Sequence, residues 1–282
     1  MNRSTKATEK LQKVLARAGL GSRREMEQWI QDGRIKIDDH IASIGDRVHD
    51  GNIIRLDGRV VTIKSTAEIR RRVIIYNKPN GEICSRKDPE NRPTVFDNLP
   101  NLYQGRWLSV GRLDINTSGL LLFTNDGELA NRLMHPSTEI ERQYAVRIHG
   151  DVLPVHIQRL RKGVELEDGI AKFDAISSSG GEGRNQWFKV ALKEGRNREV
   201  RRMWESQELE VSRLIRIQYG PISLPRTLPR GVWNELDDHQ VNELAKVAGL
   251  PPRNIERRVR DNKQMRKKRI MSRRRRAPNR NR

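Results

Sequence analysis

A single aspartate, Asp114, stands where a short extended run gives way to a turn, within the string VGRLDINTSGLLLFTNDG that spans Val110 to Gly127. Arg112 precedes it by two residues, and four small or turn-favouring residues at 116–119 let the backbone approach a ligand closely. An ionised carboxylate in such a place can attack an electrophilic carbon or remove a proton. Taken alone, an Asp at a strand end more commonly caps the turn.

The segments on either side of Asp114 must hold it in place. Residues 107–113 lead into the turn, and the unbroken apolar run Leu120 to Phe123 predicts a buried strand after it. Residues 128–134 then predict a short helix. Asp126 is expected to cap the start of that helix rather than to act as a second catalytic carboxylate.

Further short strands are predicted at 73–76, 142–148 and 187–192, the last two from the alternation of side chains along them. In the second of these, Tyr144 shares a face with the apolar residues two and four positions later. Periodicity alone therefore makes Tyr144 a packed aromatic side chain rather than a catalytic one.

Three polar segments complete this region. Residues 84–100, rich in Pro, Asn, Asp and Arg, are expected to form a loop that borders the site, or else a plain surface loop. Residues 177–184 (SSSGGEGR) are expected to be a flexible loop that matches no nucleotide-binding fingerprint. Residues 195–204 (GRNREVRRMW) are expected to begin a basic helix.

The N-terminal part predicts a small module of helices and strands. Apolar residues spaced for one helix face lie at 11–18, and Ser22 with Glu25 matches a capping box for a second helix. Short strands follow, two of them joined by an Asp57-Gly58 turn. Its crowded basic residues favour RNA contacts over a plain solvated face, and the predicted contacts are Lys13, Arg17, Arg23, Arg24, Arg34 and Lys36.

Composition indicates which kind of partner the protein binds and in which cellular compartment it is expected. The 282 residues carry a net charge of +20, which indicates a polyanionic partner, either nucleic acid or an anionic membrane. No apolar run approaches the roughly 20 residues that span a bilayer, and the start lacks the apolar core of a signal peptide. One cysteine allows neither an intramolecular disulfide nor a multi-cysteine metal site, so a reducing cytoplasm is the expected location.

Most of the net charge lies at the C-terminal end. Residues 253–282 hold 15 Lys or Arg against two acidic residues, a net of +13. Because this segment has few apolar residues to bury, we expect a disordered tail. Residues 65–72, polar and basic, are expected to be a linker.

Two strings resemble known families. LQKVLARAGLGSRRExExxIxxGRIKID resembles the S4 RNA-binding fold, and GRLDxxTxGLLxxTxDG resembles the active-site motif of the S4-containing rRNA pseudouridine synthases. The resemblance extends from Glu9 to about Leu250, and NQWFKVALKEGRNREVRRMWE and VSRLIRIQYG are most similar to a large-subunit branch of that family.

The resemblance assigns roles to individual residues. It implies that Asp114 is the catalytic residue, that Arg201 pairs with it, and that Tyr144 lies against the target base. Leu214 matches an apolar position beneath the uracil, and Arg112 is expected to fill the gap left by the flipped base or to hold a phosphate. Other members often carry His-Gln where this chain has Arg198-Glu199, which leaves the roles of those two side chains open.

The implied fold is α+β. It begins with an S4 domain at 9–64, which the linker at 65–72 joins to a catalytic domain at 73–252. The catalytic domain is expected to have a large, mainly antiparallel sheet and a central cleft, and the basic tail at 253–282 follows it. The implied activity is isomerisation of a uridine to pseudouridine in large-subunit (23S) ribosomal RNA by a monomeric enzyme. It requires no cofactor and no metal, because the product is an isomer of the substrate.

Other interpretations stay open. A non-catalytic S4-type RNA-binding or ribosome-assembly factor would share the charge excess, and a synthase acting on small-subunit rRNA would share the motifs. Within the enzyme interpretation, Asp114 either adds to C1′ or removes a neighbouring proton. The target uridine, and whether free rRNA or an assembly intermediate is the substrate, are left undecided.

Overall fold

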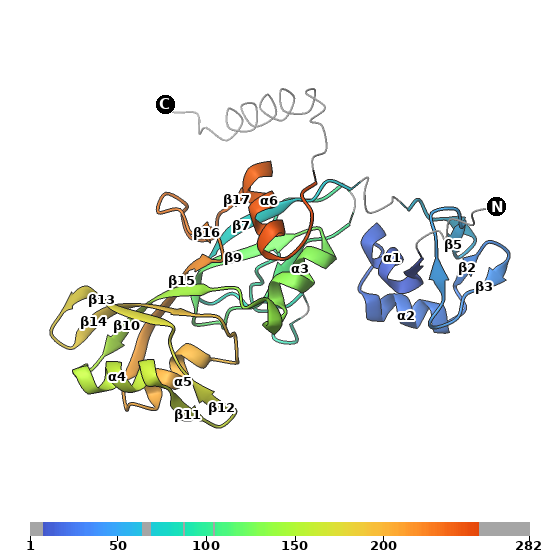
Figure 1. Ribbon diagram of the computed structural model, residues 1–282. Coiled ribbons are helices and arrows are strands. Elements are labelled where there is room, and N and C mark those ends of the chain that lie inside the picture. The colour runs from blue at the N-terminus through green and yellow to red at the C-terminus, as the bar shows by residue number, and fades with distance from the viewer. Residues whose placement is uncertain (1–7, 64–68, 87, 104, 254–282) are drawn as a thin grey trace, which may run out of the picture. The chain divides into compact units, whose positions relative to one another are not determined.

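The computed structural model describes residues 8–63, 69–86, 88–103 and 105–253 (Figure 1). Half of the predicted linker, residues 65–68, and all but the first residue of the predicted tail lie outside these ranges. The predicted disorder of the tail therefore concerns residues outside the described part of the chain.

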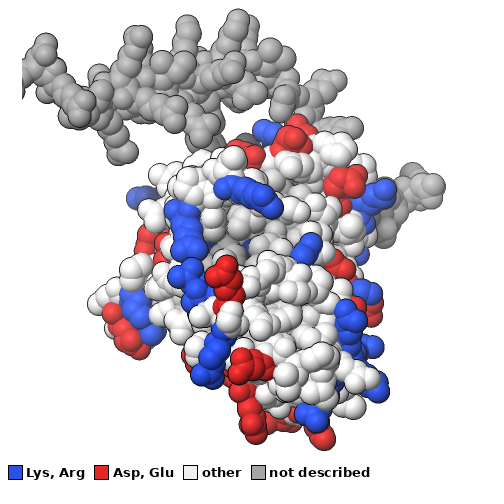
Figure 2. All heavy atoms as spheres, turned by 90° about the vertical axis from the view of Figure 1, so that its left-hand side faces the viewer, with Lys and Arg blue, Asp and Glu red and all other residues white. Residues whose placement is uncertain are grey.

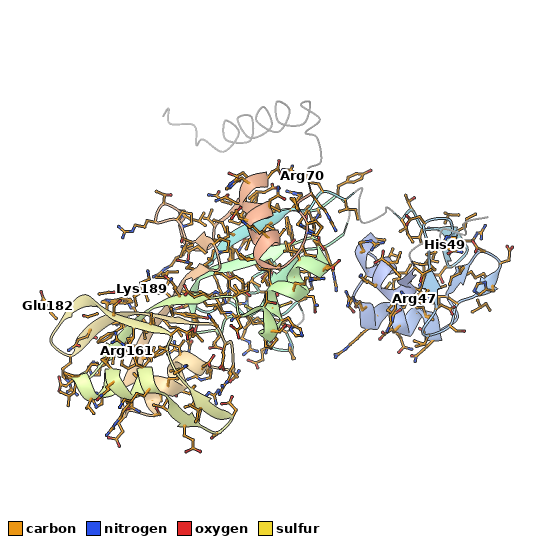
Figure 3. The ribbon with its side chains drawn as sticks, in the orientation of Figure 1. Arg47, His49, Arg70, Arg161, Glu182 and Lys189 are labelled. Atoms are coloured by element: carbon orange, nitrogen blue, oxygen red, sulfur yellow. The ribbon has the colours of Figure 1, made fainter. Side chains whose placement is uncertain are left out.

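The N-terminal module packs two helices against a small antiparallel sheet of order β3-β2-β5-β6, and a further short pair joins β1 to β4. Its elements are β1 (Glu9–Lys10), α1 (Leu11–Ala18), α2 (Arg23–Gln31), β2 (Ile35–Ile37), β3 (His40–Ile41), β4 (Arg47–Val48), β5 (Ile54–Leu56) and β6 (Arg59–Val60). Arg47 holds the first described residue in place, since its Nη2 donates to the carbonyl oxygen of Thr8 at 2.6 Å (Figure 3).

Local sequence signals explain where these helices and turns lie. Gly19, at φ +94°, ends α1 in the left-handed region. The capping box of α2 is confirmed, because the backbone N–H of Glu25 donates to Ser22 Oγ at 3.1 Å and the N–H of Ser22 donates to Glu25 Oε2 at 2.6 Å. Asp57 and Gly58 both have positive φ, as expected of a type I′ hairpin turn.

The larger domain is built on a nine-stranded sheet with the order β13-β14-β10-β15-β9-β7-β17, in which β8 also pairs with β9 and β16 with β15. Its strands are β7 (Val73–Lys78), β8 (Leu108–Val110), β9 (Ser118–Thr124), β10 (Arg142–His149), β13 (Ala175–Glu182), β14 (Asn185–Leu192), β15 (Glu210–Tyr219), β16 (Ile222–Ser223) and β17 (Trp233–Glu235). All pairs are antiparallel except β9 with β15, which run parallel over Ile215–Ser118 and Arg216–Gly119.

Two apolar cores lie on the two faces of this sheet. Alternate residues of β7 belong to different cores: Ile74 and Tyr76 to one, Val73 and Ile75 to the other. The first core includes residues of α4 and α5, and the second includes residues of α3 and α6. The remaining elements are α3 (Gly127–Met134), a 3₁₀ turn (Pro136–Thr138), α4 (Pro154–Lys162), β11 (Val164–Leu166), β12 (Gly169–Ala171), α5 (Glu199–Glu205) and α6 (Asp238–Val247).

Asp126 caps α3 as predicted. Its carboxylate accepts from the backbone N–H groups of Glu128 at 2.9 Å and Leu129 at 3.3 Å. The same carboxylate forms a buried ion pair with Nε of Arg71 at 2.9 Å. A structural role therefore accounts for this second carboxylate of the motif.

The prediction of a flexible loop at 177–184 is wrong, because most of this segment belongs to β13, an edge strand paired with β14. The register shifts between Ser178 and Gly181, where the glycines form an irregularity inside the strand. A Cβ on Gly181 would lie 2.3 Å from the carbonyl oxygen of Asn185, so this close strand contact requires glycine. Glu182 lies at the free end of the hairpin (Figure 3).

The helix predicted to begin at residue 195 begins later. Arg198 has φ +48°, in the left-handed region, and α5 starts only at Glu199. Residues 195–198 instead form a turn that leads into the helix. No prediction had been made for α4, the β11–β12 hairpin or α6.

Candidate active site

A cavity of about 830 Å³ opens beside the turn between β8 and β9. Arg112 and Asp114 line it from that turn, Tyr144 lines it from β10, and Leu214 lines it from β15. The segment 83–92 also contributes residues to the lining, so the predicted loop at 84–100 does border the cavity. Residues separated by more than a hundred positions in the sequence thus meet at one place.

The Asp114 turn is held through its backbone rather than through the carboxylate. The backbone N–H of Thr117 donates to the carbonyl oxygen of Asp114 at 3.0 Å. Within the described residues, the carboxylate of Asp114 has neither a hydrogen bond nor an ion pair. Turn capping, the competing role for this side chain, is therefore not what the structure shows.

Lys78 also holds this turn in place, a role that the sequence analysis did not predict. Its side chain is fully buried, and Nζ donates to the carbonyl oxygens of Asp114 at 3.0 Å and Thr117 at 2.9 Å. Burial lowers the pKa of Lys78, and the nearby acidic groups of Cys84, Glu82 and Asp114 oppose that shift. A lysine that ends a mainly apolar strand was the available signal.

Arg201 of α5 supports the same turn from a second element. Its Nη2 donates to the carbonyl oxygen of Asn116 at 2.9 Å and its Nη1 to that of Val211 at 2.8 Å. Burial lowers the pKa of Arg201, and the negative charge of Asp114 raises it. No direct ion pair joins the two side chains among the described residues, so their pairing stays a prediction.

Tyr144 and Leu214 contribute apolar surface to the cavity lining. Tyr144 is 8% exposed and Leu214 is 5% exposed, and both project from the same face of the paired strands β10 and β15. The register between these strands shifts between Gln143 and Tyr144. Such irregularities re-aim a side chain, here next to the cavity.

Glu199 and the arginines around it border the cavity where α5 begins. Glu199 Oε2 accepts from the backbone N–H of Arg196 at 3.1 Å, so this buried carboxylate holds the turn before α5. Burial raises the pKa of Glu199, and that hydrogen bond opposes the shift. Nη2 of Arg198 lies 3.4 Å from Glu205 Oε1. Arg112, in contrast, is exposed.

The predicted RNA contacts of the N-terminal module differ in their surroundings. Glu9 pairs with both Lys13 at 3.1 Å and Arg17 at 2.7 Å, and Arg34 pairs with Asp57. The other three are exposed and lack a carboxylate partner among the described residues: Arg23, Arg24 and Lys36. These last three are the side chains most available to phosphate. On the face of the molecule in Figure 2, basic and acidic side chains are interspersed.

Within the part of the chain that the structure describes, no group of three or more His, Cys, Asp or Glu side chains gathers as it would around a metal ion. None of the described helices combines the length and the apolar composition needed to cross a membrane.

Comparison with known proteins defines the family. The RNA pseudouridylate synthase family model matches residues 72–206, and the S4 domain model matches residues 9–54. Ribosomal large subunit pseudouridine synthase B of Escherichia coli (strain K12) is 60% identical over 247 residues, which cover 87% of this chain and 85% of that protein. The chain belongs to the RNA pseudouridylate synthase family.

A second relative agrees with this assignment, and a solved structure shows the same fold. The protein of the same name from Haemophilus influenzae is 60% identical over 245 residues, which cover 86% of this chain and 69% of the relative. A crystal structure of a pseudouridylate synthase matches the fold with a TM-score of 0.58 at 24% identity, over 83% of this chain and 99% of that one. The predicted family and the predicted α+β fold, with an S4 domain and a large, mainly antiparallel sheet, are confirmed.

Proposed function

We propose that this chain isomerises a uridine to pseudouridine in large-subunit ribosomal RNA, with Asp114 as its catalytic residue. The observation that supports the proposal most directly is the Asp114 carboxylate, which lines the cavity and takes no part in holding its own turn. The substrate class is taken from the relatives, whose names specify the large ribosomal subunit.

The reaction balances without an external reagent. The C1′–N1 bond breaks and its electron pair stays on the uracil, which then turns so that C5 bonds to C1′. C5 loses its proton and N1 gains one. Asp114 assists by adding to C1′ or by removing a proton from the sugar, and both routes require its ionised form.

The other lining residues supply the base-binding surface. Tyr144 stacks on the flipped uracil, an interaction worth about 1–3 kcal/mol per base, and its hydroxyl helps to remove the C5 proton. Leu214 packs against the ring from the neighbouring strand. Arg112, exposed at the rim, fills the gap in the RNA stack or holds a phosphate.

Further features support RNA as the partner. The S4 module brings basic side chains that contact phosphates and so position the enzyme on folded RNA. We place the enzyme in the cytoplasm as a monomer that acts on rRNA, either free or within an assembly intermediate.

Mapping pseudouridines in ribosomal RNA tests this proposal. Cells that lack the protein are expected to lose pseudouridine at a site in large-subunit RNA, and the intact gene should restore it. A gene encoding Asp114→Asn should not restore it. An unchanged map would favour the non-catalytic assembly factor, and a loss confined to small-subunit RNA would refute the substrate assignment.

Deletion of residues 253–282 is expected to weaken RNA binding at low salt and to flatten the plot of log affinity against log salt. The reason is that a +13 segment releases condensed counterions when it contacts phosphate. The modified uridine should not change, because this segment has no aromatic residue to stack on a base.

Binding titrations at several salt concentrations provide the measurement for this deletion. A matched control keeps the length of the tail and replaces its basic residues with Gln, and it should behave like the deletion. An unchanged salt slope would show that the tail does not touch the RNA.

A further inference from the structure

Arg216 lies in the wall of the cavity, and the proposed reaction has given it no role so far. It is 2% exposed, sits on β15 directly opposite Tyr144, and lines the cavity together with Leu214. Its Nε donates to the carbonyl oxygen of Leu120 at 2.7 Å. Its Nη2 is buried without a hydrogen-bond partner.

Two other buried arginines of this domain are better compensated. Arg71 pairs with the carboxylate of Asp126 at 2.9 Å. Arg142 donates from Nη1 to the carbonyl oxygens of Ile140, Lys193 and Glu194. Arg216 makes a single hydrogen bond and has no carboxylate within ion-pair distance among the described residues.

A buried cation without a counter-charge is costly, so proteins rarely keep one unless it serves a purpose. The guanidinium of Arg216 stacks on the ring of Tyr219, with Cζ 5.2 Å from its centroid, which compensates only part of that cost. The positive charge also reaches the cavity. Burial raises the pKa of the cavity-lining Cys84 thiol, and the charges of Lys78, Arg216 and Arg112 oppose that shift.

We propose that Arg216 is a further catalytic residue, whose guanidinium stabilises the negative charge that builds on the uracil as the C1′–N1 bond breaks. This inference rests on the proposed isomerisation. The electron pair of the broken bond spreads from N1 onto the two uracil carbonyl oxygens, next to Tyr144 and hence next to Arg216. A fixed donor beside a developing charge stabilises that charge without reorganisation.

The experiment compares two substrates in single-turnover reactions, RNA with uridine and RNA with 5-fluorouridine at the target position. Fluorine withdraws electrons and stabilises the uracil anion by itself, and it also blocks the final loss of the C5 proton. Cleavage of the C1′–N1 bond is therefore followed by nucleoside analysis of the digested RNA. Arg216→Met is expected to slow the uridine reaction by about 100-fold, the usual loss of one such donor, and the 5-fluorouridine reaction by less than ten-fold.

Three variants separate charge from structure. Arg216→Lys keeps the charge and should retain more activity than Arg216→Met on uridine RNA. Arg216→Gln removes the charge but keeps a donor for Leu120, so it decides the question if the Met variant does not fold. Arg142→Met removes a structural arginine from the same cavity and should slow both substrates by the same factor.

Equal losses on both substrates for Arg216→Met and Arg216→Gln would overturn the inference and leave Arg216 a structural role. Parental rates in both variants would also overturn it. If the parent enzyme itself rearranges neither substrate, the proposed isomerisation fails first. RNA affinity within three-fold of the parent, together with an unchanged melting temperature, confirms that any loss lies in the chemical step.

Discussion

Asp114→Asn is expected to abolish pseudouridine formation while RNA affinity stays within a few-fold of the parent value. The amide keeps the shape of the side chain but neither attacks C1′ nor stabilises positive charge on the sugar. The turn itself should be unaffected, because Lys78 and Thr117 hold it through the carbonyl oxygen of Asp114, not through the carboxylate.

Release of tritium from RNA labelled at uracil C5 measures this activity. Asp88→Asn provides a matched control, since Asp88 lines the same cavity but is paired with Arg92 at 2.8 Å. Hydrogen bonds from Arg92 lower the pKa of Asp88 to about 2, as expected of a carboxylate that is held in a structural ion pair. The control should release tritium at close to the parental rate. Normal turnover by Asp114→Asn would remove Asp114 from the catalytic role.

Arg201→Met is expected to lower activity by orders of magnitude, and Arg201→Lys is expected to lower it less. Methionine removes the donors to Asn116 and Val211 and a positive charge close to Asp114. Lysine keeps the charge and loses only the geometry of the planar fork.

Arg202→Met tests whether loss of any arginine from α5 has the same effect. Arg202 is the next residue of the helix and pairs with Asp168 at 2.7 Å, so its loss should leave turnover nearly unchanged. Rates of tritium release and thermal unfolding curves are compared for all three variants. Parental activity in both Arg201 variants would show that Arg201 does not support catalysis.

Local patterns predicted the parts of this molecule that depend on neighbours in sequence. The Ser22–Glu25 capping box, the N-cap at Asp126 and the buried strand after Asp114 all rest on interactions within a few residues. Only the resemblance to a family brought the site residues Asp114, Tyr144 and Leu214 together, because they lie on three separate elements: the turn before β9, strand β10 and strand β15. Their meeting point depends on how those strands are ordered in the sheet.

What the sequence analysis missed depends on contacts between distant segments. Lys78 is a structural cation because of carbonyl oxygens about forty residues away. The glycine-rich residues of β13 form a strand only because β14 pairs with them, against their low intrinsic preference for strands. Arg216 is unusual only once its burial and its single hydrogen bond are known.

The short parallel contact between β9 and β15 also determines how accurately the two sides of the proposed catalytic centre are aligned. Asp114 belongs to the half of the sheet that ends at β9, while Tyr144 and Leu214 belong to the half that ends at β15. Backbone hydrogen bonding fixes neighbouring strands about 4.8 Å apart. A Cβ at Gly119 would lie 2.3 Å from the carbonyl oxygen of Arg216, so any larger residue there would force the halves apart. The width of the cavity between Asp114 and Tyr144 therefore depends on the backbone pairing of β9 with β15 and on the absence of a side chain at Gly119.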